Sequence, residues 1–185
     1  GSNPFIPPIE GMNKKGVVTF RNMADTEMIL EACKTVKQAV VIGGGLLGLE
    51  AARGILNQGV KVTVVHLMDR LMDVQLDEIG GQFLKREIEK LGITVLLNTN
   101  TSRIMGQENV EGVMFKDGSI VEAGLVVVAC GIRPNVDLAK KAGLEVNRGI
   151  VVNDYMETSD PNIFAVGECV EHRGKVYGLV APLYD

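Results

Sequence analysis

The chain has 185 residues, a formal net charge of −4 and a hydrophobic content of 46%. That length and content suit one complete α/β domain with flanking pieces better than two full domains. The basic residues are scattered among acidic ones and aromatic residues make up only 4% of the chain, so we expect no nucleic-acid partner. No apolar run approaches the roughly 20 residues that span a bilayer and no signal peptide is evident, so we expect a cytoplasmic protein without a membrane partner.

The first residues have the character of a connecting segment. Prolines at positions 4, 7 and 8 favour extended backbone from Asn3 to Gly11. Asn22 is then placed to cap a helix that continues through Leu30 to Cys33.

A glycine motif follows the first clear strand. Ala39 to Ile42 predicts a buried strand, and Gly43-x-Gly45-x-x-Gly48 comes directly after it. The three glycines would allow a tight turn, close approach of a pyrophosphate, and close packing of helix on strand. The positive end of the following helix would face the phosphates. An apolar helical face, a capping Gly59 and a second strand over 60–65 complete a βαβ unit that predicts a dinucleotide site.

The next segments extend this pattern to β-α-β-α-β. Asp77 is placed to cap a helix that ends at Gly92, and residues 93–97 predict a third strand. Strands over 101–105 and 110–115, a turn at Asp117-Gly118 and a strand at 119–121 then predict an antiparallel meander. Residues 125–129 form an apolar strand suited to burial on both faces. The fold class predicted is α/β, with a Rossmann-like domain built on a doubly wound sheet.

Beyond Gly131 the predicted elements become shorter. A small helix over 136–142 and strands over 150–152 and 163–166 are expected. Residues 134–185 cannot enclose a core alone, so they pack on the first domain or belong to a second one. The three cysteines, Cys33, Cys130 and Cys169, are far apart, so we expect no metal site; Cys130 and Cys169 are interpreted as structural residues.

Three motifs taken together resemble a known family. They are the 43–50 glycine motif, Ala129-Cys-Gly-Ile-Arg-Pro-Asn135, and Thr158-Ser-Asp-Pro-Asn-Ile-Phe-Ala-Val-Gly-Glu-Cys169. Together they are similar to the FAD-dependent pyridine nucleotide-disulfide oxidoreductases, in which an NAD(P)-binding domain is inserted into an FAD-binding domain. The resemblance implies a linker and helix from the FAD-domain side over 1–35, an NAD(P)-binding domain over 36–131, and a partial C-terminal part of the FAD-binding domain over 132–185.

Within that family, residues 167–174 and 177–183 are similar to the cofactor-binding region of nitrite reductase large subunits. The resemblance implies an enzyme that passes a hydride from NAD(P)H to FAD and sends electrons through iron–sulfur and sirohaem centres to reduce nitrite to ammonia. The N-terminal FAD-binding part and the iron–sulfur and sirohaem domain would then be partners supplied by the rest of the parent, and this segment alone is expected to be inactive. A non-catalytic NADH-sensing module is an alternative, as is a segment of a rubredoxin or ferredoxin reductase or of an NADH oxidase.

The resemblance also implies roles for single residues. Glu50 would be an acid close to the nicotinamide and the flavin, and Gly131 would lie beside the nicotinamide half. Gly167 and Glu168 stand where the family commonly has Gly-Asp touching the ribityl chain of FAD. The pyrophosphate of NAD(P) would be held by Gly43, Gly44, Gly45, Leu46, Leu47 and Gly48.

The end of the second strand departs from the usual pattern. An NAD-preferring site usually places Asp or Glu there to bind the ribose 2′-OH, whereas this chain has His66. His66 could hydrogen-bond a 2′-OH, and Arg70 could pair with a 2′-phosphate. We therefore expect NADH binding with weak discrimination against NADPH.

Overall fold

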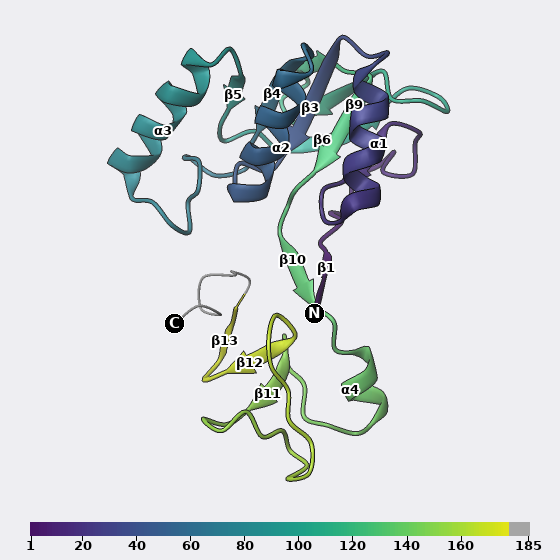
Figure 1. Ribbon diagram of the computed structural model, residues 1–185. Helices are drawn as coiled ribbons and strands as arrows, with labels where there is room; N and C mark the ends of the chain where they lie inside the picture. The colour runs from purple at the N-terminus through teal and green to yellow at the C-terminus, as the bar shows by residue number, and fades with distance from the viewer. Residues whose placement is uncertain (178–185) are drawn as a thin grey trace. The chain divides into compact units, whose positions relative to one another are not determined.

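We describe residues 1–177 in a computed structural model of the chain; the 178–183 part of the last motif lies outside the described residues. The chain divides into two compact units, one made of residues 6–131 and one made of residues 1–5 together with those from 132 onward. Each unit is described by itself below (Figure 1). Among residues 1–177, no helix combines the length and the apolar character needed to cross a membrane.

The unit of residues 6–131 is built on a parallel sheet with the strand order β2-β9-β3-β4-β5. Helices connect the strands in sequence, and β9 returns to pair with β3. The elements are β2 (Val17–Thr19), α1 (Met23–Cys33), β3 (Gln38–Ile42), α2 (Leu46–Asn57), β4 (Lys61–Val65), α3 (Glu78–Lys90), β5 (Thr94–Leu96) and β9 (Leu125–Val128). The predicted β-α-β-α-β order and the α/β fold class are confirmed.

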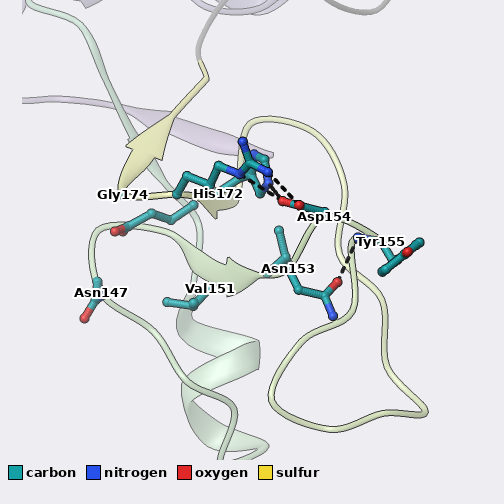
Figure 2. A pocket seen from close by; sticks show the side chains of 10 residues that line it. Asn147, Val151, Asn153, Asp154, Tyr155, His172 and Gly174 are labelled. Carbon is teal, nitrogen blue, oxygen red and sulfur yellow. Dashed lines mark hydrogen bonds and ion pairs between the residues drawn. The ribbon is translucent and has the colours of Figure 1, made fainter.

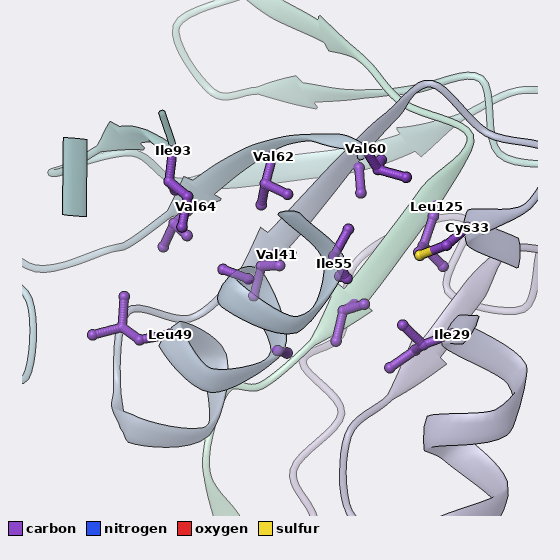
Figure 3. Packing of buried hydrophobic residues seen from close by; sticks show 14 of the residues in the cluster. Ile29, Cys33, Val41, Leu49, Ile55, Val60, Val62, Val64, Ile93 and Leu125 are labelled. Atoms are coloured by element: carbon purple, nitrogen blue, oxygen red, sulfur yellow. The ribbon is translucent and has the colours of Figure 1, made fainter. Parts of the chain in front are cut away.

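The helices cover one face of this sheet. Figure 3 shows Ile29 from α1 and Ile55 from α2 beside Val41 and Leu125 of the central strands, and all four side chains are buried. Because β3 and β9 lie between two packed layers, their residues must be apolar on both faces, and Val40, Val41, Val126 and Val127 are fully buried.

The predicted antiparallel meander is present, and it covers the opposite face of the sheet. It consists of β6 (Thr101–Met105), β7 (Gly112–Phe115) and β8 (Ile120–Glu122). Ile104, Val113 and Phe115 of the meander pack with Val40 and Val126 of the parallel sheet in a second buried cluster. This unit therefore has three layers: helices, parallel sheet and meander.

The other unit contains short elements only. They are β1 (Ser2–Pro4), β10 (Ile132–Pro134), α4 (Asp137–Lys141), β11 (Ile150–Val152), β12 (Val170–His172) and β13 (Lys175–Val176). β1 pairs antiparallel with β10, so the beginning of the predicted extended segment, up to Pro4, is extended. β11, β12 and β13 form a second small sheet, with β12 in the centre.

One expectation differs from the structure. Residues 163–166 do not form a strand: Phe164 makes one isolated bridge with Glu157, and Phe164 and Val166 are 60% and 69% exposed. The segment has the composition of a buried strand, but the described residues provide no neighbouring strand to pair with it. Residues 6–35 belong to the same compact unit as the parallel sheet, since α1 packs on β2 and β9.

Candidate functional site

The glycine turn lies where three parallel strands end. β3, β4 and β9 are neighbours; residues 43–45 connect the carboxyl end of β3 to α2, and residues 46–48 form the first turn of that helix (Figure 1). The N–H of Gly43 donates to the carbonyl of Val65 at the end of β4, at 2.9 Å, and the N–H of Ala129 after β9 donates to the carbonyl of Ile42, also at 2.9 Å. In open α/β sheets, ligands bind at this edge, next to the strand where the connection order reverses.

Each glycine of the motif has a different environment. Gly43 has a φ of +123°, and a Cβ there would lie 2.2 Å from the carbonyl oxygen of Ala129. A Cβ on Gly48 would lie 2.0 Å from the carbonyl oxygen of Gly43, so the helix can approach the strand only without a side chain. A Cβ on Gly45 would meet nothing within 4 Å. The first and third glycines are therefore required by packing, whereas Gly45 borders open space.

The amino end of α2 is available to an anion. Its N-cap is Gly45, and no side chain makes a capping hydrogen bond. The first N–H groups of a helix have no partner within the helix, and together with the helix dipole they favour negative charge. Leu46 and Leu47 in the first turn are 46% and 38% exposed. With the open space at Gly45, these residues fit a phosphate group.

His66 directly follows β4 and contacts the glycine turn. Its Nδ1 accepts a hydrogen bond from the N–H of Gly44 at 3.0 Å, and its Nε2 lies 2.9 Å from Oδ1 of Asp73. The His66 side chain is only 12% exposed. In this arrangement the chain itself uses both ring nitrogens, so neither is left for a ribose hydroxyl.

Arg70 is held by the same loop. Its Nε donates to the carbonyl of Leu76 at 3.1 Å, and its two terminal nitrogens contact Asp69 Oδ1 at 2.9 Å and the carbonyl of Asp73 at 3.3 Å. The guanidinium therefore organises the 69–76 loop. Sequence reasoning did not identify Asp73, because nothing in the spacing of a loop shows which carboxylate folds back to the strand end.

Gly131 lies two residues beyond Ala129, at the same edge of the sheet. It is exposed, has a φ of +99°, and a Cβ there would meet nothing within 4 Å. The adjacent Cys130 thiol donates to the carbonyl of Ile42 at 3.4 Å, and burial raises its pKa to about 11. A thiol with that pKa carries almost no thiolate at neutral pH, which agrees with a structural role.

The remaining predicted residues lie elsewhere. Glu50 is exposed in α2, on the helix that the glycine turn begins. Gly167 and Glu168 belong to the other unit, where Gly167 has a φ of +88° and Glu168 accepts a hydrogen bond from the Ser2 hydroxyl at 2.7 Å. The sheet edge thus brings together the glycine turn, His66, the Arg70 loop and Gly131.

The unit that contains Gly167 also has a cavity of about 550 Å³ beside β11 and the β12–β13 hairpin (Figure 2). Its charged side chains are paired. Asp154 Oδ1 lies 2.7 Å from Nε2 of His172, and the Asp154 carboxylate accepts two hydrogen bonds from the Arg173 guanidinium at 3.0 and 2.6 Å. These contacts with Arg173 and His172 lower the pKa of Asp154 to about 2.

A second carboxylate in this cavity also serves the fold. Glu171 is buried and accepts hydrogen bonds from the backbone N–H groups of Gly149 at 3.1 Å and Arg148 at 2.8 Å. Those bonds lower the pKa of Glu171. Glu171 therefore fixes the turn before β11, and Asp154 fixes the β12–β13 hairpin.

The three-layer fold, with its glycine turn at the carboxyl edge of the parallel sheet, defines an α/β protein of the Rossmann-like class. Residues 1–180 match the pyridine nucleotide-disulphide oxidoreductase family, and the chain belongs to that family.

Over its whole length the chain is 59% identical to nitrite reductase [NAD(P)H] and 50% identical to the assimilatory nitrate reductase electron transfer subunit, both of Bacillus subtilis (strain 168). It spans 23% and 24% of those two proteins. Among solved structures, the NAD-dependent persulfide reductase from A. fulgidus superposes with a TM-score of 0.89 at 38% identity, over 92% of this chain and 32% of that one.

Proposed function

We propose that this chain is the NAD(P)H-binding segment of a flavoprotein reductase. The observation that carries the proposal is the uncapped amino end of α2 beside the open space at Gly45, located where β3, β4 and β9 end. Residues 43–48 would hold the pyrophosphate, and Gly131 would border the nicotinamide half. Membership of the pyridine nucleotide-disulphide oxidoreductase family supports this assignment.

In the longer protein, the reaction we propose is hydride transfer from NAD(P)H to FAD, followed by electron transfer that reduces nitrite to ammonia. The 59% identity to nitrite reductase [NAD(P)H] supports nitrite as the final acceptor. Glu50 would be the acid nearest the reacting rings. Gly167 and Glu168 would contact the flavin, and the exposed apolar side chains of Phe164 and Val166 would be covered by the rest of the flavin-binding domain.

A second candidate is the electron-transfer component of a nitrate reductase, favoured by the 50% identity to the assimilatory nitrate reductase electron transfer subunit. The longer protein separates the two candidates. Under the first, NADH oxidation by the purified protein should accelerate when nitrite is added and should produce ammonia. Under the second, nitrite should have no effect, and NADH oxidation should require an added nitrate reductase subunit.

The nucleotide site can be tested on this chain by substituting Gly45. Gly45→Ser places a side chain in the open space and supplies a hydroxyl that can cap the first N–H groups of α2. We expect Gly45→Ser to keep the thermal stability of the wild type and to weaken NADH binding at least about tenfold, because the side chain takes the position and the donors of the phosphate. Titration of NADH by calorimetry measures the affinity.

Gly54→Ala is the matched control, because Gly54 lies on the same helix and a Cβ there meets nothing within 4 Å. It should bind NADH as the wild type does. Wild-type affinity in Gly45→Ser would contradict the proposed site.

A further inference from the structure

The hydrogen-bond directions around His66 determine its tautomer. The N–H of Gly44 can only donate, so Nδ1 of His66, at 3.0 Å, must be the acceptor without a hydrogen. Nε2 then carries the hydrogen of the neutral ring and donates it to Asp73 Oδ1 at 2.9 Å. The imidazole therefore bridges the backbone of Gly44 and the Asp73 carboxylate, and it holds that carboxylate beside the glycine turn.

The loop that carries Asp73 is attached to the glycine turn at a second point. The N–H of Met72 donates to the carbonyl of Gly44 at 2.9 Å, and a Cβ on Gly44 would lie 2.6 Å from Leu71 Cδ2. The Asp73 side chain is 24% exposed. Within residues 1–177 its Oδ1 is bonded to His66, while its Oδ2 has no hydrogen-bond partner. A positioned carboxylate oxygen is thus left for a ligand beside the turn.

We propose that Asp73, positioned by His66, is the carboxylate that selects NADH over NADPH. This inference rests on the proposed nucleotide site at residues 43–48. In dinucleotide sites of this fold, an acid at the end of the second strand binds the ribose 2′-OH. Here His66 directly follows that strand, β4, and its ring holds the carboxylate of Asp73 where the acid would otherwise lie. The Asp73 carboxylate accepts a hydrogen bond from a 2′-OH and repels a 2′-phosphate.

Arg70 does not offset this repulsion. Its guanidinium is paired with the Asp69 carboxylate, and it also donates to the carbonyls of Asp73 and Leu76, so its charge is balanced and its plane is held within the loop. The selection therefore favours NADH more strongly than the sequence alone indicates.

The test compares the affinities of NADH and NADPH, because their ratio is insensitive to a loss of folded protein that affects both nucleotides equally. Each nucleotide is titrated by calorimetry into the wild type, Asp73→Asn and Glu78→Gln. We expect Asp73→Asn to shift the affinity ratio at least about tenfold toward NADPH, because it removes the repulsion between a carboxylate and a 2′-phosphate that carries nearly two negative charges. Glu78→Gln removes the same charge from an exposed position on α3 and should leave the ratio unchanged.

Variants of His66 and Arg70 test the positioning. His66→Leu removes the bond to Asp73 and should shift the ratio as Asp73→Asn does, whereas His66→Gln can still donate to Asp73 and should keep the wild-type ratio. Arg70→Ala should weaken both nucleotides alike. An unchanged ratio in Asp73→Asn, or a loss confined to NADPH in Arg70→Ala, would overturn the inference. If the wild type binds neither nucleotide, the proposed function itself fails, which is a different result.

Discussion

Gly48 and Gly54 occupy the same helix and differ in what surrounds them. A Cβ on Gly48 would lie 2.0 Å from the carbonyl oxygen of Gly43, whereas one on Gly54 would meet nothing within 4 Å. We expect Gly48→Ala to lower the free energy of unfolding by about 1–3 kcal/mol through overpacking. Gly54→Ala should raise it by about 0.5–1 kcal/mol, because alanine is the better helix former. Urea unfolding measures both, and equal effects would show that α2 is not tightly packed on the turn.

Asp154 gives the fold a dependence on pH. Its pKa is about 2 in the folded chain, against an ordinary value of 3.8, because Arg173 and His172 favour the ionised form. A lowered folded pKa contributes stability that is fully present above about pH 4 and is lost as the pH falls toward 2. Asp154→Asn should therefore lower the melting temperature at pH 7, and the difference from the wild type should shrink as the pH falls below 4. A difference in melting temperature that stays constant down to pH 3 would show that the ionised Asp154 carboxylate is not the source of this stability.

Residues whose role depends on their immediate neighbours could be predicted from the sequence. The Gly43, Gly45 and Gly48 spacing predicted the turn, because each glycine acts within one strand–turn–helix unit. The bond between His66 and Asp73 could not be predicted, because it requires the loop after β4 to fold back on the glycine turn. Sequence reasoning placed His66 at the correct strand end but did not identify the groups that occupy its ring nitrogens.

Helix α3 buries little of its own surface. Gly81 is its only buried residue, while Leu84 and Ile88 pack partly against the core. As predicted, Asp77 caps this helix, with its Oδ1 accepting from the N–H of Gly80 at 2.8 Å. We expect Asp77→Ala to lower the free energy of unfolding by about 1 kcal/mol and Asp77→Ser to retain most of that stability. Amide hydrogen exchange should show the loss in the first turn of α3; uniform protection in both variants would be the contrary result.

The long elements could be predicted because their patterns are long. The apolar runs of β3, β4 and β9 and the capped helices predicted the order of these elements along the chain, whereas the strand order within the sheet was not predicted. The strands β2, β12 and β13 have only two or three residues each, too few to show a period, and their pairing depends on partners distant in sequence. Residues 163–166 show the opposite case. Their composition is typical of a strand, but they form no strand because no neighbouring strand among the described residues pairs with them.

At the scale of the whole chain, the buried core is concentrated in one unit. Both large buried clusters lie within residues 6–131, as do the glycine turn, His66, Asp73 and Gly131. Because every strand of the parallel sheet also lies there, this unit has what an independent domain needs. We therefore expect residues 6–131, expressed alone, to unfold cooperatively and to bind NADH as tightly as the full chain does.

Circular dichroism and calorimetric titration of residues 6–131, with the full chain measured in parallel, check this expectation. An unfolded product would show that residues 1–5 or those after 131 are needed for the core. A folded product with at least about tenfold weaker NADH binding would mean that the nucleotide site extends beyond residue 131, since tenfold in affinity corresponds to about 1.4 kcal/mol, the size of one good polar contact. Equal affinity would place the whole site at the carboxyl edge of the parallel sheet, where the ends of β3, β4 and β9 supply every group proposed to contact the nucleotide.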